Sequence, residues 1–213
     1  MRVVSNKNIY SLIHPGYVRN VPDWRYIMNV YESCPTFVSA HFTLRLVRME
    51  DAPGLLKVYS CRQAQHYFNC DNCHSDFRYS TLQEMEACIR MWLWSYEQRH
   101  FVRWTILCDQ KPVGTVEMFR RDDGKDGKGE GVLRLDLISS FEFSNDIDEI
   151  LRIILPAMHE LFGCARILTK AMRFMEQRRV ALVLHGFMPC KEPLIGENGV
   201  EYGEYWSRRY NPR

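Results

Sequence analysis

The chain has 213 residues and a formal net charge of +2, and 46% of its residues are hydrophobic while 25% are charged. This composition excludes a disordered chain, and the nearly balanced charge indicates no nucleic-acid partner. The sequence has no apolar run near the roughly 18 residues that a membrane span needs, and residues 1–12 lack a signal-peptide core. With eight cysteines and no such signal, we expect reduced thiols, a cytoplasmic location and no membrane partner.

Residues 1–40 are rich in aromatic side chains and are interrupted by prolines, which predicts an N-terminal arm packed on the rest of the chain. The aromatic residues expected to dock this arm are Trp24, Tyr26, Tyr31 and Phe37. A regular pattern begins after the arm, so residues 41–213 are expected to form one domain.

Strand and helix patterns alternate along this domain. Residues 41–48 alternate as a half-buried strand, and the acids and proline of residues 50–53 begin a helix. Thr81 and Glu84 can form a capping box at the start of a second helix. Further strands are expected at 102–108, 113–119, 132–138 and 166–172, a helix at 146–162, and a hairpin at the Asn198-Gly199 turn that joins 189–195 to 200–210.

One predicted helix contains a proline, and one predicted loop is rich in glycine. The apolar stripe of the 146–162 helix is interrupted by Pro156, so we expect either a kinked helix or two shorter helices. The glycine-rich segment 120–131 matches neither a calcium-binding nor a Walker pattern, which leaves a hairpin loop as its interpretation.

The order of elements predicts an α/β (α+β) fold with a mixed, mostly antiparallel central sheet and helices on both faces. One parallel βαβ crossover joins 132–138 to 166–172. This arrangement resembles the GCN5-related N-acetyltransferase (GNAT) family, in particular its ribosomal-protein and small-molecule acetyltransferases, and so implies an acyl-CoA N-acyltransferase-like fold. The resemblance extends from about residue 41 to residue 210, and its motifs are Leu44–Asp51, Lys111–Val116 and His185-Gly186-Phe187.

The resemblance implies acetyl-CoA as co-substrate, with its pyrophosphate on a glycine-rich turn that opens a helix. This turn corresponds to about residues 143–148, where Asp146 and Asp148 replace the two glycines. Acids at a helix N-terminus compete with an anionic ligand, and a Cβ keeps the backbone from the phosphate. Two interpretations stay open, an altered coenzyme site or a helix that Asn145 or Asp146 simply caps. The residues implied at the coenzyme are Leu137, Ile138, Ser139, Ser144, Asn145 and Arg178.

The resemblance also implies a tyrosine acid before Gly186-Phe187, but that position is Leu182, and an expected asparagine position is Met175. Another acid is therefore needed, and Tyr205 on the last strand is the candidate, with Tyr202 as an alternative.

The general base in such enzymes is often a carboxylate on a central strand, and Glu117 and Asp136 have suitable positions. A structural explanation competes for each. Asp136 can pair with Arg134, two residues away on the same strand face, and Glu117 can lie on an exposed strand face.

The expected reaction is transfer of an acetyl group from acetyl-CoA to an amine of a small molecule, peptide or protein. The alternative is a catalytically inactive GNAT-fold module that binds a ligand or a protein, and either reading leaves room for a homodimer. A third option is metal- or redox-linked regulation, because several possible metal ligands cluster in one segment. We expect this segment to be a loop that carries thiols and binds no metal. These possible ligands are Cys61, His66, Cys70, Cys73 and His74.

Overall fold

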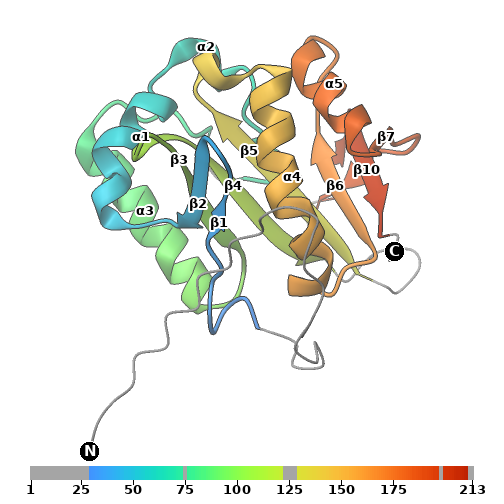
Figure 1. The fold of residues 1–213 in the computed structure, drawn as a ribbon, viewed down its shortest axis with the longest axis horizontal. Coiled ribbons are helices and arrows are strands. Elements are labelled where there is room, and N and C mark those ends of the chain that lie inside the picture. Colours follow the sequence, from blue (N-terminus) through green and yellow to red (C-terminus); the bar gives the residue numbers. More distant parts are fainter. Residues whose placement is uncertain (1–28, 74–75, 122–128, 197–198, 211–213) are drawn as a thin grey trace, which may run out of the picture.

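The computed structural model describes residues 29–73, 76–121, 129–196 and 199–210, and a single eight-stranded sheet forms its centre (Figure 1). Every neighbouring pair of strands in this sheet is antiparallel except β5 and β6, which are parallel. In spatial order the strands are β1 (Phe37–Val38), β2 (Phe42–Leu46), β3 (Val102–Cys108), β4 (Lys111–Arg121), β5 (Glu130–Leu137), β6 (Arg166–Lys170), β10 (Tyr205–Arg209) and β7 (Met188–Pro189).

Helices cover both faces of the sheet, so the predicted fold class is confirmed. One face packs against α1 and α3, and the other packs against α4, which also contacts α5. None of the helices in the described part of the chain is long and apolar enough to cross a membrane. The helices are η1 (Met49–Asp51), α1 (Ala52–Tyr59), α2 (Arg62–Gln65), α3 (Leu82–Glu97), η2 (Ser139–Phe141), α4 (Ser144–Leu161) and α5 (Glu176–Leu184).

The predicted capping box at the start of α3 is confirmed. The Thr81 hydroxyl accepts a hydrogen bond from the Glu84 backbone N–H at 3.2 Å, and the Glu84 carboxylate accepts one from the Thr81 N–H at 3.0 Å. These two bonds satisfy backbone donors that the first turn of a helix leaves without partners. The helix then buries Met85, Ile89 and Trp92 in a core cluster that it shares with α1.

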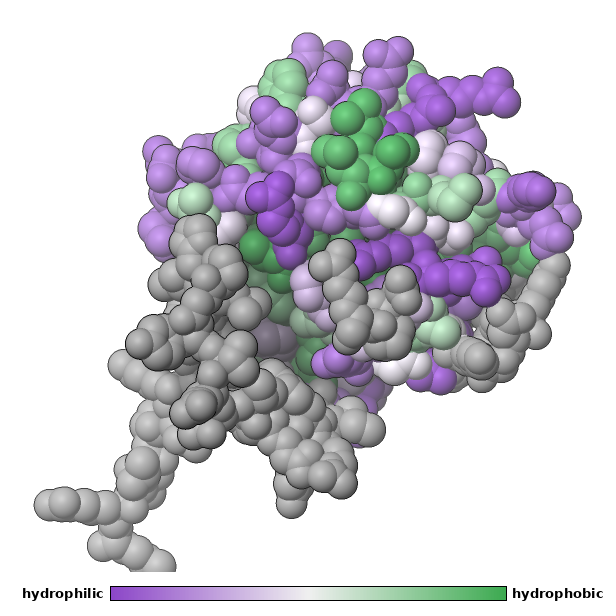
Figure 2. All heavy atoms as spheres, turned by 45° about the vertical axis from the view of Figure 1, so that its right-hand side comes forward, coloured by the Kyte–Doolittle hydropathy of each residue, from purple (hydrophilic) through white to green (hydrophobic). Residues whose placement is uncertain are grey.

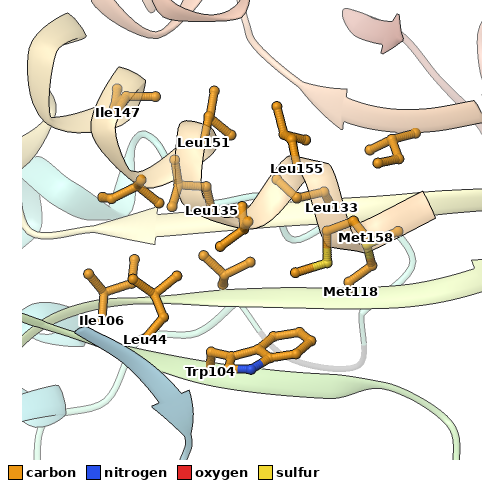
Figure 3. Close-up of a cluster of buried hydrophobic side chains, with 14 of the residues drawn as sticks. Leu44, Trp104, Ile106, Met118, Leu133, Leu135, Ile147, Leu151, Leu155 and Met158 are labelled. Atoms are coloured by element: carbon orange, nitrogen blue, oxygen red, sulfur yellow. The ribbon is translucent and has the colours of Figure 1, made fainter. Parts of the chain in front are cut away.

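α4 is one continuous helix that contains Pro156, so the alternative of two shorter helices is wrong. A proline inside a helix costs about 3 kcal/mol or more. Burial of each large apolar side chain contributes roughly 1.5–3 kcal/mol, so the stripe facing the sheet outweighs that loss. Figure 3 shows this stripe over the sheet residues Leu133 and Leu135. The buried residues of the stripe are Ile147, Ile150, Leu151, Ile154, Leu155 and Met158.

Residues 29–40, the described part of the predicted arm, pack against the rest of the chain. Tyr31 and Phe37 lie against the main core cluster, and β1 pairs with β2. The Trp104 indole donates a hydrogen bond to the Pro35 carbonyl at 3.0 Å. Trp24 and Tyr26, also expected to dock the arm, lie outside the described residues.

The C-terminal hairpin is shorter than predicted. Its outer part is the pair β8 (Leu194–Ile195) and β9 (Glu201–Tyr202), and its inner part is the pair β7 and β10. Gly199 has a φ of +75°, which a turn glycine adopts without strain, while Asn198 lies outside the described residues. β10 also pairs with β6 along its whole length, and this pairing places β10 second from the edge of the sheet, between β6 and β7.

Candidate functional site

The parallel strands β5 and β6 separate halfway along the sheet. They pair from Glu130 to Leu133 on β5 and from Arg166 to Thr169 on β6. β5 continues to Leu137 and pairs there only with β4, while β6 ends at Lys170. In Figure 1 the two arrows point to the same end of the sheet and separate there. We call this gap, bounded by residues 134–137 of β5 and by Lys170, the opening.

A buried ionic network lines the sheet face that packs on α1 and α3. The Arg103 side chain is 1% exposed, contacts the Glu117 carboxylate and lies with its guanidinium carbon 4.1 Å from the centroid of the Trp92 ring. Glu117 is also bound by Arg134 at 2.8 Å. Burial alone raises the pKa of Glu117, but the two guanidinium groups outweigh it and hold that pKa below its usual value. Glu117 is therefore a permanent counter-ion at neutral pH.

Asp136 has a different environment on the same face. Its Oδ2 accepts a hydrogen bond from the Tyr59 hydroxyl at 2.9 Å and lies 3.4 Å from an Arg103 nitrogen. Its Oδ1 is buried and has no hydrogen-bond partner among the described residues. Burial raises the pKa of Asp136, and attraction to Arg103 offsets this only in part. Asp136 is thus a carboxylate with one free oxygen and an increased affinity for a proton.

The predicted pairing of Asp136 with Arg134 is wrong. In the register of β4 and β5, Arg134 lies directly opposite Glu117, and Asp136 lies opposite Thr115. Opposed side chains on neighbouring strands are closer than side chains two residues apart on one strand. Arg134 therefore binds Glu117.

A loop between α2 and α3 reaches the edge of the opening. Both carboxylate oxygens of Asp71 contact the Lys170 ammonium, at 2.7 and 2.8 Å, and the Asp71 carbonyl accepts a hydrogen bond from Arg134 at 2.7 Å. The Tyr205 hydroxyl donates to Asp71 at 3.2 Å and accepts from Asn69 at 3.1 Å. Burial raises the pKa of Tyr205, so its hydroxyl keeps its proton at neutral pH. The loop thus connects β5, β6 and β10.

A cavity of about 410 Å³ adjoins this cluster. Asp71, Arg134 and Tyr205 form part of its wall. The strands β4 and β5 also contribute to it, and the β8–β9 hairpin closes another side with Leu194, Gly196 and Tyr202. This volume is within the range of small-molecule sites. Two of the groups at the edge of the opening, Arg134 and Tyr205, are therefore accessible from a compartment that fits a small ligand or the end of a peptide.

The N-terminus of α4 has no side-chain cap. Its N-cap residue is Phe143, so Asn145 and Asp146 lie in the first turn and the capping role expected for one of them is wrong. The Ser144 N–H donates to the Gln177 side chain at 3.2 Å. Within the described residues, the N–H groups of Asn145 and Asp146 have no acceptor. Two donors thus remain available for an anion.

Most of the acidic side chains near this turn form ion pairs with basic side chains of the chain itself. Asp148 contacts Arg152 and His185, and Glu149 contacts His41. Burial and the neighbouring Glu149 raise the pKa of Asp146, for which the described residues show no ion pair. Asp146 is therefore the residue of this turn that most opposes an anionic ligand.

The remaining residues predicted at the coenzyme lie between the opening and α4. Leu137 ends β5 in the core, Ile138 is half-buried, and the Ser139 hydroxyl contacts the Gln63 side chain at 3.3 Å. Arg178 is buried, binds the Glu142 carboxylate and donates to the Tyr67 carbonyl at 3.4 Å. A second cavity of about 650 Å³ adjoins these residues, and its lining includes Ser139, Glu142, Phe143 and Gln177.

Leu182 and Met175, the family's expected tyrosine and asparagine positions, are buried core residues. Burial raises the pKa of Cys70 to about 12 and that of Cys73 as well, which disfavours reactive thiolates. In the described ranges, no three candidate ligands converge as a metal site would require, and His74 lies outside them.

The chain matches no sequence family and no curated protein. Solved structures do match it. The microcin C7 self-immunity acetyltransferase MccE, in complex with acetyl-CoA and AMP, has a TM-score of 0.64 at 12% identity over 81% of this chain and 94% of its own. RimL, a ribosomal L7/L12 alpha-N-protein acetyltransferase in complex with coenzyme A, has a TM-score of 0.63 at 14% identity over 81% and 96%.

An acetyltransferase from Salmonella typhimurium that modifies the N-terminal serine of ribosomal protein L7/L12 has a TM-score of 0.58 at 12% identity, over 81% of this chain and 97% of its own. These identities are low, but each TM-score is above 0.5 over most of both chains, so the likeness is one of fold. The chain therefore has the acyl-CoA N-acyltransferase fold of the GCN5-related N-acetyltransferases.

Proposed function

We propose that the chain is an N-acetyltransferase that transfers an acetyl group from acetyl-CoA to an amine of a small molecule or of a peptide. The observation that carries this proposal is the free oxygen of Asp136, a buried carboxylate on the strand that borders the opening. Buried carboxylate oxygens without partners are rare, and they mark places where a ligand or a proton is received. Two of the similar structures hold coenzyme A or acetyl-CoA, which supports the choice of co-substrate.

We expect acetyl-CoA to occupy two adjacent parts of the site. In the proposal the thioester lies in the opening beside Leu137, Ile138 and Ser139. The phosphates lie at the free N–H groups of the first turn of α4, close to Ser144 and Asn145. Arg178 would supply a positive charge once its contact with Glu142 is loosened.

We assign the catalytic roles by environment. Asp136 is the general base, because its pKa is raised and its Oδ1 is free to accept a proton from the attacking amine. Tyr205 is the general acid that protonates the departing thiolate, because its hydroxyl is protonated and lies beside the opening. Glu117 is a positioning residue, since both of its oxygens are bound by arginines.

Calorimetric titration with acetyl-CoA, followed by a thiol-release assay with a panel of amines, tests this function. We expect saturable binding and release of coenzyme A with at least one amine. Asp136→Asn should keep binding but lower turnover by a factor of roughly 10²–10⁴, the usual contribution of a general base. Asp109→Asn, at the exposed turn between β3 and β4, is the matched control and should retain full turnover.

One observation favours the alternative of a catalytically inactive binding module. Glu142 and Arg178 form a buried ion pair next to the proposed phosphate position, and Gln177 already takes the first N–H of α4. If that pair is permanent, it excludes the coenzyme. A titration without heat at millimolar acetyl-CoA, together with unchanged thermal stability, would favour this module over the enzyme.

The remaining expectations are part of the same proposal. Residues 1–40 form an arm on a domain of residues 41–213, and the protein acts in the cytoplasm without nucleic-acid or membrane partners. A homodimer is supported by α5, which exposes Val180, Val183 and Leu184. Figure 2 shows a mostly hydrophilic side of the molecule that carries one compact hydrophobic cluster. Size-exclusion chromatography with light scattering tests the dimer.

A further inference from the structure

Lys170 has an unusual position for a lysine. It directly follows Thr169, the last residue of β6 that pairs with β5, and so it occupies the first position of the opening. Its register partner on β10 is Tyr205. The side chains of register partners project to the same face of a sheet, and the Lys170 ammonium lies 6.0 Å from the centroid of the Tyr205 ring. Its side chain is 15% exposed.

The Lys170 amine is held in place by a second, independent set of contacts. Asp71 binds it through both carboxylate oxygens, and Asp71 is itself fixed by Arg134 and by the Tyr205 hydroxyl. A primary amine, a carboxylate and a tyrosine hydroxyl therefore meet where the two strands separate. These are the kinds of group that amine acylation by a thioester requires.

We propose that Lys170 is acetylated by the chain that carries it, an inference that rests on the proposed function. The Lys170 ammonium loses a proton to Asp71, which passes it to solvent. The free amine attacks the acetyl carbon of acetyl-CoA, a C–N bond forms and the C–S bond breaks. The departing thiolate takes the Tyr205 proton, which solvent replaces, and the second proton of the attacking nitrogen leaves through Asp71 to solvent. The products are acetylated Lys170, coenzyme A and one released proton.

Acetylation changes the wall of the adjoining cavity. The product amide carries no charge and one N–H donor, so it cannot hold both oxygens of Asp71. Asp71 also lines the 410 Å³ cavity, and its loop contacts three strands through side chains of β5, β6 and β10. The unmodified lysine therefore anchors the loop at the opening, and the acetylated form releases it toward solvent.

Mass spectrometry of the purified full chain after incubation with acetyl-CoA tests the proposal. We expect one acetyl group, mapped by proteolysis to Lys170, at a rate per molecule that does not change with protein concentration. Lys57 and Lys111 are exposed lysines that report direct chemical acetylation, and the same chain unfolded in urea reports the intrinsic reactivity of Lys170. Lys170→Arg keeps the positive charge and should lose the fast acetylation.

Two results would overturn the proposal. One is acetylation of Lys170 no faster than that of Lys57 and Lys111, and the other is fast acetylation that persists in Lys170→Arg. The comparison of Lys170 with Lys57 and Lys111 is made on the unaltered chain, so it decides the question even if the Lys170→Arg variant does not fold. Binding of acetyl-CoA with turnover of an added amine, but without modified Lys170, would remove this inference and leave the proposed function intact. Absence of acetyl-CoA binding would remove both.

Discussion

Replacement of Arg103 by methionine should destabilise the protein severely. The Arg103 side chain is 1% exposed and compensates two buried carboxylates, Glu117 and Asp136. Removal of one partner from a buried ion pair costs about 3–5 kcal/mol, because a charge is left without compensation. Methionine retains part of the contact with the Trp92 ring, so we expect the loss of charge to dominate.

The loss of about 3–5 kcal/mol is a large share of the roughly 5–15 kcal/mol by which a domain is stable. It corresponds to a decrease in melting temperature of roughly 6–20 °C, at about 2–4 °C per kcal/mol for a chain of this size. Urea unfolding followed by tryptophan fluorescence measures it. Arg90→Met, which removes an exposed partner of Glu86 on α3, is the control and should change stability by about 0.5 kcal/mol or less.

A double-mutant cycle isolates the ionic contribution. If the Arg103–Glu117 contact carries the effect, Arg103→Met combined with Glu117→Gln should cost less than the sum of the two single changes, by roughly 1–3 kcal/mol. A single change Arg103→Met that costs under about 1 kcal/mol, or a cycle without coupling, would refute the ionic explanation of this core.

The other predictions concern the turn, one histidine and one cap. Asp146→Asn should tighten acetyl-CoA binding by about 0.3–1 kcal/mol, because it removes an acid from the helix N-terminus; weaker binding by calorimetry would contradict this. Burial lowers the pKa of His159, so the folded chain keeps it neutral. The free energy of unfolding should therefore be highest above a pH of about 6.5 and should fall as the pH drops below that value. In urea unfolding, the His159→Gln variant should show a smaller fall over the same pH range. Thr81→Ala should cost about 1 kcal/mol in the same assay, and a loss near zero would remove the capping box as a stabilising feature.

Most of the fold could be predicted because its strands and helices have strong local patterns. The capping residues Thr81 and Glu84 mark the start of α3 in the sequence and in the structure. The effect of Pro156 could not be predicted, because the energy that keeps α4 continuous comes from packing on the sheet, which local sequence does not show.

The candidate site was predictable only in part. The β5 carboxylate Asp136 follows from its strand, but its partners do not, since Tyr59 and Arg103 come from distant segments. Asp71 and Lys170 were missed for the same reason, because their contact spans 99 residues. Their signal in the sequence is weak, because Lys170 is only a lysine at the end of a buried strand and Asp71 is only an acid in a loop. The three catalytic and six coenzyme residues predicted from sequence stay predictions.

Amide hydrogen exchange with and without acetyl-CoA tests most directly whether the opening and the first turn of α4 bind the coenzyme. We predict slower exchange over residues 134–147, which include the end of β5 and the free N–H groups of Asn145 and Asp146, with a much smaller change over α3. Unchanged exchange over residues 134–147 at millimolar acetyl-CoA would contradict the proposed site.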